Sequence, residues 1–285
     1  MPPQLPNELY RNIVGYVPGR AELATLCAVS PALRFEAERV LYHTVEILEY
    51  HRILSWSATV ASSSRLASIV HSLTLPDATH PAPVVNEISQ ALRETTNLKY
   101  LTTKPPEVVS LSSSMCLKAK SLIGCGFRLY GLSGDLHVPQ SNFLWWFLSE
   151  QSDIHSWVIG NSMDLHLPYL PDWILPNLST LDLLMLMPSN LVYFHPRPIE
   201  CLSIGTEWGS FGRLDLFKDT LTSLTCHYKG PPGMSIEDQL GSIAALVPDI
   251  KALHYNTFVL STVRTSVRVS FVEPTLMSYR ADIQS

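Results

Sequence analysis

A short apolar motif recurs along this chain at intervals that few folds accommodate. The segment Leu178–Leu183 reads apolar, two residues, Leu, one residue, apolar. Copies of the same pattern occupy residues 199–204 and 221–226, so the central Leu moves from position 181 to 202 and then to 224. This period suits a solenoid, in which each strand buries alternate residues and a return segment leads to the next strand. We therefore predict an array of repeated strand and return units.

Further copies of the motif extend the expected array in both directions. The predicted central positions are residues 45, 73, 101, 122, 157, 181, 202, 224 and 253. Their uneven spacing is explained by return segments of different lengths, and some of these carry a helical apolar stripe, as residues 236–247 do. Alternating apolar and polar residues over 263–271 predict a last strand that covers the edge of the sheet.

Composition restricts the classes of partner. Of the 285 residues, 46% are apolar and the net charge is −5, without the clustered Lys and Arg that bind nucleic acid or anionic membranes. The amino-terminal residues lack the pattern of a signal peptide, so we expect a cytoplasmic and/or nuclear protein. Five Cys form no C-x-x-C pair, and the apolar surroundings of Cys27, Cys201 and Cys226 predict buried free thiols.

Residues 1–45 carry three short helical patterns. We expect Asn7 to cap the first helix, which places Leu9 and Ile13 on one face. The second pattern covers residues 21–29, and Ser30–Pro31 predicts the start of the third, because Ser caps a helix and Pro fits its first position. Three helices of this size make a marginal domain alone, so the segment should lean on a partner or on the repeats.

This amino-terminal segment resembles an F-box. The resemblance rests on L-P-x-E-L-x-x-x-I at residues 5–13, L-x-x-L-x-x-V-S-x-x-L-R at 23–34 and L-Y-x-x-V-x-I at 41–47. It implies binding to the Skp-type adaptor of a cullin-RING ubiquitin ligase. The residues expected to bind that adaptor are Pro6, Leu9, Ile13, Leu26, Val29 and Leu33. The sequence departs from the family at residues 35–40, where F-E-A-E-R-V replaces the usual Trp and basic residues.

The repeated strand and helix pattern resembles irregular leucine-rich repeats. This resemblance implies an α/β solenoid with a parallel concave sheet and outer helices. The predicted domains are an F-box-like helical domain over residues 1–45, the solenoid over 46–272 and a loosely held tail over 273–285. Trp145 and Trp146 are expected to be buried on one of the outer helices.

Residues that alternate with the buried ones should line the concave face. They are mostly small hydroxyl residues, with one clear charge, which suits a protein partner held by hydrogen bonds. They do not form the Arg cluster that a phosphorylated peptide would require. The residues expected to contact a protein substrate are Tyr100, Thr102, Ser156, Thr180, Asp182, Ser203, Thr225 and His254.

No motif in the chain favours catalysis. Gly124-Cys-Gly126 lacks a correctly spaced third Gly for a phosphate loop, and no His or Cys pair has the spacing of a metal site. We therefore expect no catalytic residue, metal or cofactor, and a non-catalytic adaptor that recruits an unknown protein substrate for ubiquitylation. Two alternatives are a repeat scaffold whose first helices are only a cap, and an enzyme whose residues converge from distant segments.

Overall fold

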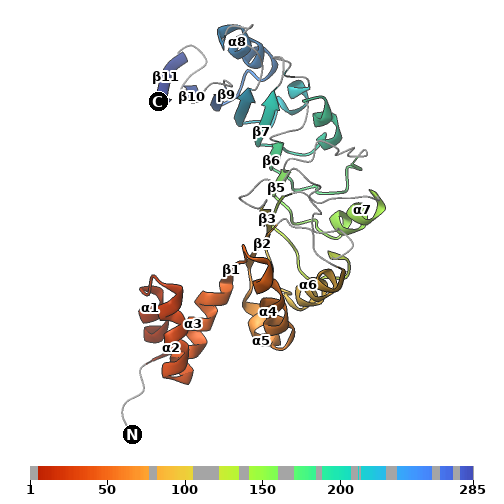
Figure 1. The fold of residues 1–285 in the computed structure, drawn as a ribbon. Helices are drawn as coiled ribbons and strands as arrows, with labels where there is room; N and C mark the ends of the chain where they lie inside the picture. The colour runs from red at the N-terminus through yellow and green to blue at the C-terminus, as the bar shows by residue number, and fades with distance from the viewer. Residues whose placement is uncertain are drawn as a thin grey trace. The chain divides into compact units, whose positions relative to one another are not determined.

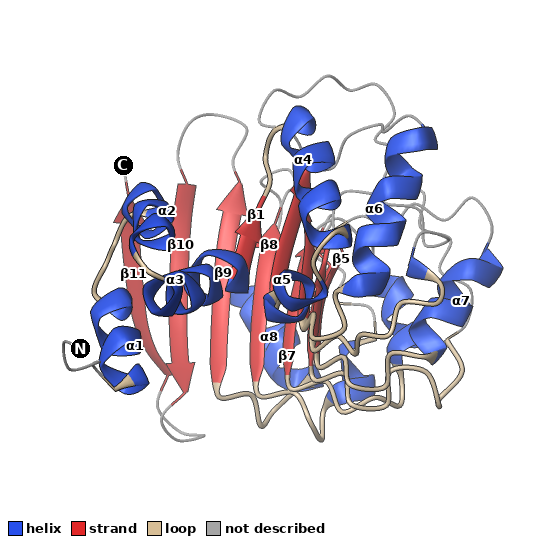
Figure 2. Cartoon of the chain, turned by 90° about the horizontal axis from the view of Figure 1, so that it is seen from below, coloured by secondary structure: helices blue, strands red, loops and turns tan. Residues whose placement is uncertain are grey.

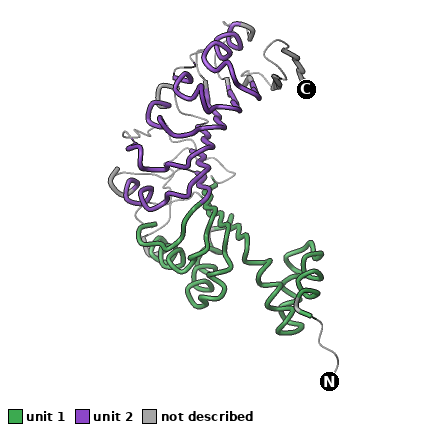
Figure 3. Tube along the Cα trace, turned by 180° about the vertical axis from the view of Figure 1, so that it is seen from behind, with its two compact units in different colours: residues 1–129 green, residues 130–285 purple. Residues whose placement is uncertain are grey.

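A computed structural model divides the chain into two compact units, residues 1–129 and 130–285 (Figure 3). The structure describes residues 6–76, 82–104, 122–134, 141–159, 170–183, 188–206, 211, 213–228, 236–258, 264–271 and 277–284. Each unit is an α/β assembly of parallel strands with helical returns, so the two are described in turn. No helix in these described ranges is both long enough and apolar enough to cross a membrane.

Unit 1 starts with three helices and continues as strands joined by helical returns. Its elements are α1 (Asn7–Gly15), α2 (Arg20–Val29), α3 (Pro31–His43), β1 (Thr44–Glu46), α4 (Tyr50–Ala61), α5 (Ser64–Ile69), β2 (Ser72–Pro76), α6 (Ala82–Glu94) and β3 (Tyr100–Lys104). The three strands pair in parallel in chain order, and Val45, Leu73 and Leu101 lie opposite one another as the motif predicts. Figure 1 shows α4 and α6 together on one side of these strands.

The helix boundaries in α1–α3 follow the local capping chemistry. Ser30 caps α3 as predicted, because its hydroxyl accepts a 3.3 Å hydrogen bond from the Leu33 amide and Pro31 occupies the first position. The prediction for Asn7 is wrong, since this residue lies inside α1 and Pro6 precedes the helix without a side-chain cap. The first turn is closed instead by the Leu9 amide, which donates to the Pro6 carbonyl.

Unit 2 repeats the same plan, and most of its returns are shorter. Its elements are β4 (Gly131–Ser133), α7 (Ser141–Ser149), β5 (Ser156–Ile159), β6 (Thr180–Leu183), the 3₁₀ helix η2 (Pro188–Phe194), β7 (Cys201–Thr206), the 3₁₀ helix η3 (Leu214–Phe217), β8 (Ser223–Tyr228), α8 (Ile236–Leu246), β9 (Ala252–Phe258), β10 (Arg264–Phe271) and β11 (Met277–Gln284). Strands β4 to β9 pair in parallel in chain order, and β10 and β11 continue the sheet in antiparallel fashion (Figure 2).

The repeated motif builds the core of unit 2. Its central residues are buried and lie in one continuous register row: Trp157, Leu181, Leu202, Leu224 and Leu253. The first apolar position of each of these copies is buried as well, from Ile154 to Ile250. Each copy therefore supplies one layer of a stacked apolar core, which confirms the predicted α/β arrangement of parallel strands.

The predicted strand around Leu122 is wrong. Leu122 is buried in a turn, where its carbonyl accepts from the Cys125 amide and Gly124 adopts a φ of +76°. That left-handed backbone ends any extended run. The strand is β4 instead, whose Leu132 lies opposite Trp157. Both candidate copies carry Gly at their last apolar position, so the motif alone could not distinguish them.

The predicted tail over residues 273–285 is also wrong, because residues 277–284 form β11 along the full length of β10. The strand expected over 263–271 exists as β10, but it lies between β9 and β11 rather than at the edge. The sequence explains why residues 277–284 form a strand. M-S-Y-R-A-D-I-Q alternates apolar and polar residues, as a strand with two different faces requires.

Candidate interaction surfaces

Large apolar side chains are exposed on α1–α3. Leu9 is 43% exposed and Val29 is 63% exposed, and Ile13 and Phe35 are exposed to a similar degree. Pro6, directly before α1, is exposed as well. Val40 of α3 is exposed to a lesser extent, at 38%. Exposed apolar patches are typical of surfaces that bind other molecules, so α1–α3 carry a candidate interaction surface.

Two of the predicted adaptor-binding residues face the core of this segment rather than its surface. Leu26 and Leu33 are half-buried and pack against the small core of this segment, whose fully buried members are Val14, Leu23 and Ala37. Their first role is therefore to hold the three helices together. The structure leaves Pro6, Leu9, Ile13 and Val29 as the predicted residues with the most accessible side chains.

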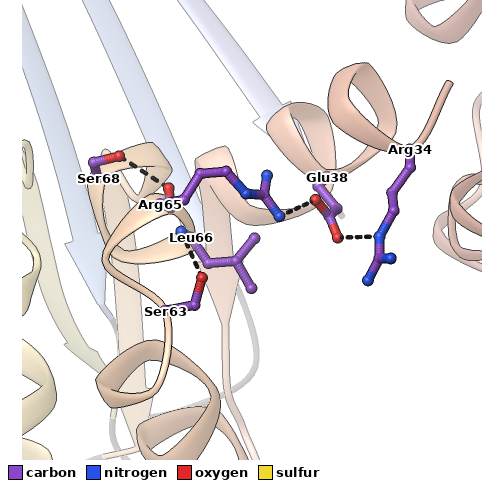
Figure 4. A network of polar contacts seen from close by, with 6 residues as sticks. All are labelled: Arg34, Glu38, Ser63, Arg65, Leu66 and Ser68. Atoms are coloured by element: carbon purple, nitrogen blue, oxygen red, sulfur yellow. Dashed lines mark hydrogen bonds and ion pairs between the residues drawn. The ribbon is translucent and has the colours of Figure 1, made fainter. Parts of the chain in front are cut away.

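The acidic residues of α3 are engaged within unit 1. Glu38 accepts a 3.0 Å hydrogen bond from Nε of Arg34 and pairs with Arg65 of α5 (Figure 4). Glu36 pairs with Arg39 at 3.0 Å and with Arg11 of α1 at 3.7 Å. Both carboxylates are buried. Glu36 and Glu38 thus tie α3 to its neighbours, a role that the sequence did not reveal.

The same contacts set the ionisation of Glu38. Burial favours the neutral acid, but hydrogen bonds from Arg34 and Arg65 and the charges of both guanidinium groups outweigh it. The pKa of Glu38 is therefore lowered from its ordinary value. Glu38 is a carboxylate at neutral pH, which keeps the link between α3 and α5 ionic.

The sheet of unit 1 presents the predicted residues Tyr100 and Thr102 on β3. They lie opposite Ser72 and Thr74 of β2, so hydroxyl groups form neighbouring rows on this face. Tyr100 is exposed and Thr102 is half-buried. Lys104 of β3 forms a 2.5 Å ion pair with Glu46 of β1. The hydrogen bond and the charge of Lys104 lower the pKa of Glu46.

The sheet of unit 2 brings the other predicted residues into two rows. Ser156 lies opposite Thr180, and a second row joins Asp182, Ser203, Thr225 and His254. All six are half-buried, as expected for side chains standing on a sheet surface beside one another. We call these six residues the polar sheet face of unit 2.

Aromatic stacks occur beside the strands, and sequence reasoning did not find them. The rings of Tyr130 and His155 stack at 4.6 Å in unit 2, and those of His43 and His71 stack at 4.6 Å in unit 1. Each of these four residues lies two positions before the central residue of a repeat motif. That shared position is the sequence feature from which the stacks could have been predicted. Burial, followed by the charges of His71 and Arg39, lowers the pKa of His43.

Metal-binding clusters are not found among the described residues: no three His, Cys, Asp or Glu side chains lie close enough to hold an ion. The Gly124–Gly126 segment leads to β4 through residues without regular secondary structure, so no helix start follows it as a phosphate loop would need. The described surfaces are therefore apolar side chains on helices and hydroxyl rows on sheets.

Together, these features define the class of the protein as an α/β repeat protein with three amino-terminal helices. No known protein-family model matches the chain, and no curated protein matches it either.

Proposed function

We propose that this protein is a non-catalytic adaptor that binds a Skp-type subunit of a cullin-RING ubiquitin ligase through α1–α3. The observation that carries the proposal is the exposure of Leu9, Ile13 and Val29 on helices with an F-box-like sequence. A three-helix segment with only three fully buried apolar residues gains little stability from its own core, and burying these side chains against a partner would add to it.

The second half of the proposed function is substrate recruitment by the repeats. The polar sheet face of unit 2 offers hydroxyl groups, one carboxylate and one imidazole in fixed register. Such a surface holds a protein segment by hydrogen bonds and shape, whereas the chain itself breaks no bond of the substrate. Tyr100 and Thr102 provide a similar hydroxyl-bearing surface in unit 1.

Co-purification tests adaptor binding. Tagged full-length chain is co-expressed with a Skp-type adaptor, and the amount of adaptor recovered is compared with that of the double variant Pro6→Ala, Leu9→Ala. We expect the wild-type chain to recover the adaptor and the double variant to lose most of it. Leu54→Ala on α4 is the matched control, because it removes an exposed Leu from outside α1–α3.

A second candidate function is favoured by one contact. The ion pair between Glu38 of α3 and Arg65 of α5 fixes the last amino-terminal helix onto the first return helices. This is what a cap that covers the first repeat would need. A scaffold with such a cap would recover no adaptor in the co-purification, and removal of residues 1–41 would lower its solubility.

A further inference from the structure

The net negative charge of this protein lies in one stretch that has almost no Lys or Arg. Residues 130–212 contain eight Asp and Glu but a single cation, Arg197. The rest of the chain therefore holds 19 of the 20 Lys and Arg and 17 of the 25 acidic residues, and is close to neutral. Five of the six Trp lie in this stretch as well, so it is both acidic and rich in aromatic residues.

The one cation of the stretch does not reach the surface. Arg197 is 3% exposed, and its guanidinium donates to the carbonyl oxygens of Leu170, Pro171 and Ile174 at 2.7–3.3 Å. Because Arg197 is the only Lys or Arg of residues 130–212, none of that stretch's own cations is left to offset its surface acids. The same bonds hold the loop that carries Asp172 and Trp173.

Two Trp side chains of this stretch are exposed. Trp146 on α7 is 67% exposed, and Trp173, beside the carbonyls that Arg197 binds, is 65% exposed. The prediction that Trp146 is buried on an outer helix is therefore wrong, and Trp145 beside it is half-buried. An indole in water costs free energy in proportion to its apolar area, so two of them at this exposure mark a contact surface.

The two Trp side chains stand on consecutive return segments that are joined to each other. Trp146 belongs to the return before β5, and Trp173 belongs to the return between β5 and β6. The amide of Asn177 donates a 3.0 Å hydrogen bond to the Ser152 carbonyl and so links the ends of the two returns. The exposed acids Glu150 and Asp153 lie in the turn that this bond fixes.

We propose that this acidic aromatic surface, defined by Trp146, Glu150, Asp153 and Trp173, binds a protein segment rich in Lys and Arg. Charge complementarity selects that occupant, because carboxylates attract a basic segment and repel nucleic acid or an anionic membrane. Indole faces bind the same cations by cation–π contact, Arg more often than Lys, and pack against their aliphatic stems.

The surface is also suited to rapid and specific association. Arg197 and Asn177 fix the backbone beside Trp173, so little conformational entropy is lost when a partner packs on that indole. Trp is among the residues that contribute most to binding energy when a partner buries them. The surrounding acids steer a basic partner toward them at low ionic strength.

Fluorescence anisotropy with defined peptides tests the proposal on the full-length chain. The probe is a labelled peptide in which Lys and Arg alternate with Leu and Ser, and the reference peptide has Glu in place of every Lys and Arg. We expect the basic peptide to bind and the acidic one not to bind. Trp146→Ala and Trp173→Ala should each weaken binding about tenfold, and Glu150→Gln with Asp153→Asn should weaken it further at low salt.

Matched controls separate this surface from general charge attraction. Leu54→Ala removes an exposed apolar side chain from α4, and Glu87→Gln with Glu94→Gln removes two exposed acids from α6. Neither control should change the affinity, and circular dichroism checks that every variant is folded. The proposal is overturned if the basic peptide does not bind, or if both Trp variants bind it as tightly as the wild-type chain. Adaptor binding is measured with α1–α3 variants, so either proposal can fail alone.

Discussion

Nε of Arg197 donates a 2.9 Å hydrogen bond to the carbonyl oxygen of Ile174, 23 residues earlier in the chain. The other guanidinium nitrogens reach the carbonyls of Leu170, Pro171 and Tyr193. Buried carbonyl groups need a donor, and one planar side chain supplies several of them here. This arrangement fixes the backbone of residues 170–175, which are turns and bends without a helix in the described part of this return segment.

We predict that Arg197→Ala destabilises unit 2 by about 2–4 kcal/mol, because several carbonyls lose their donor and the buried side-chain volume is emptied. Arg197→Lys should recover only part of this loss, since an ammonium group cannot reach the same set of carbonyls with its three donors. Urea unfolding followed by Trp fluorescence measures both effects. Equal unfolding midpoints for Arg197→Ala and the wild-type chain would contradict this account.

The Glu38 contacts predict a dependence of stability on pH. A lowered pKa in the folded state means that Glu38 stabilises the fold above its unfolded pKa of about 4.3. That contribution disappears as the pH falls through the lower, folded pKa. Glu38→Gln should cost about 1–3 kcal/mol at pH 7 through its hydrogen bonds to charged groups. The Glu38→Gln variant should also lose less stability than the wild-type chain when the pH falls.

Thermal unfolding between pH 7 and pH 3 measures this prediction. Glu22→Gln serves as the control, because Glu22 is an exposed acid of α2. If Glu38→Gln and the wild-type chain lose stability in parallel over this range, the paired carboxylate is not the cause. Arg65→Gln combined with Glu38→Gln should cost less than the sum of the two single changes, because the two residues share one contact.

A third prediction concerns thiol reactivity. Burial raises the pKa of the Cys226 thiol to about 12, so the nucleophilic thiolate is scarce at neutral pH. Cys201 on the neighbouring strand is half-buried, and Cys27 is half-buried in α2. The prediction of buried thiols is thus confirmed for Cys226. Cys27 and Cys201 are only half-buried, so the prediction holds for them in part. Cys226 should react with maleimide only when unit 2 unfolds.

Mass spectrometry after timed alkylation checks the order of reaction. Cys201 and Cys27 should be modified in the native protein, and Cys226 should follow the rate of unfolding as urea is added. If Cys226 is modified as fast as Cys201 without denaturant, β8 opens in the native protein and the prediction is wrong. Cys226→Val keeps the site apolar but adds the volume of about one methyl group, so it should cost about 1–3 kcal/mol.

The spacing of the apolar motif was enough to predict most of the strands of this fold. Eight of the nine expected central residues lie in β-strands, and within each unit they share one register. This was possible because each repeat buries the same positions against its neighbours, so the period in the sequence is the period of the structure. The copy at Leu132 was missed because Leu122, ten residues earlier, carries the same degenerate motif with Gly at its last position.

The surfaces were harder to predict than the strands. The alternation rule gave the polar sheet face, because side chains in a strand point to opposite sides. It could not show that Glu38 would find Arg65 27 residues away, or that Arg197 would be buried among carbonyls. Such contacts depend on how return segments of irregular length pack, and the sequence carries no period for them.

The last prediction concerns Asn side chains that join consecutive returns. Asn177 donates to the Ser152 carbonyl at 3.0 Å, and Asn97 donates to the Ser68 carbonyl at 2.7 Å, each from the position before a buried Leu. Although both Asn are exposed, Asn→Ala should cost about 1 kcal/mol at either site, because one cross-repeat hydrogen bond is lost. Asn→Asp should cost at least as much, since a carboxylate cannot donate. Asn12→Ala on α1 removes another exposed Asn and should not lower the urea midpoint, because Ala favours a helix more than Asn does. If all three Ala variants unfold at the wild-type midpoint, these amides do not hold the returns together.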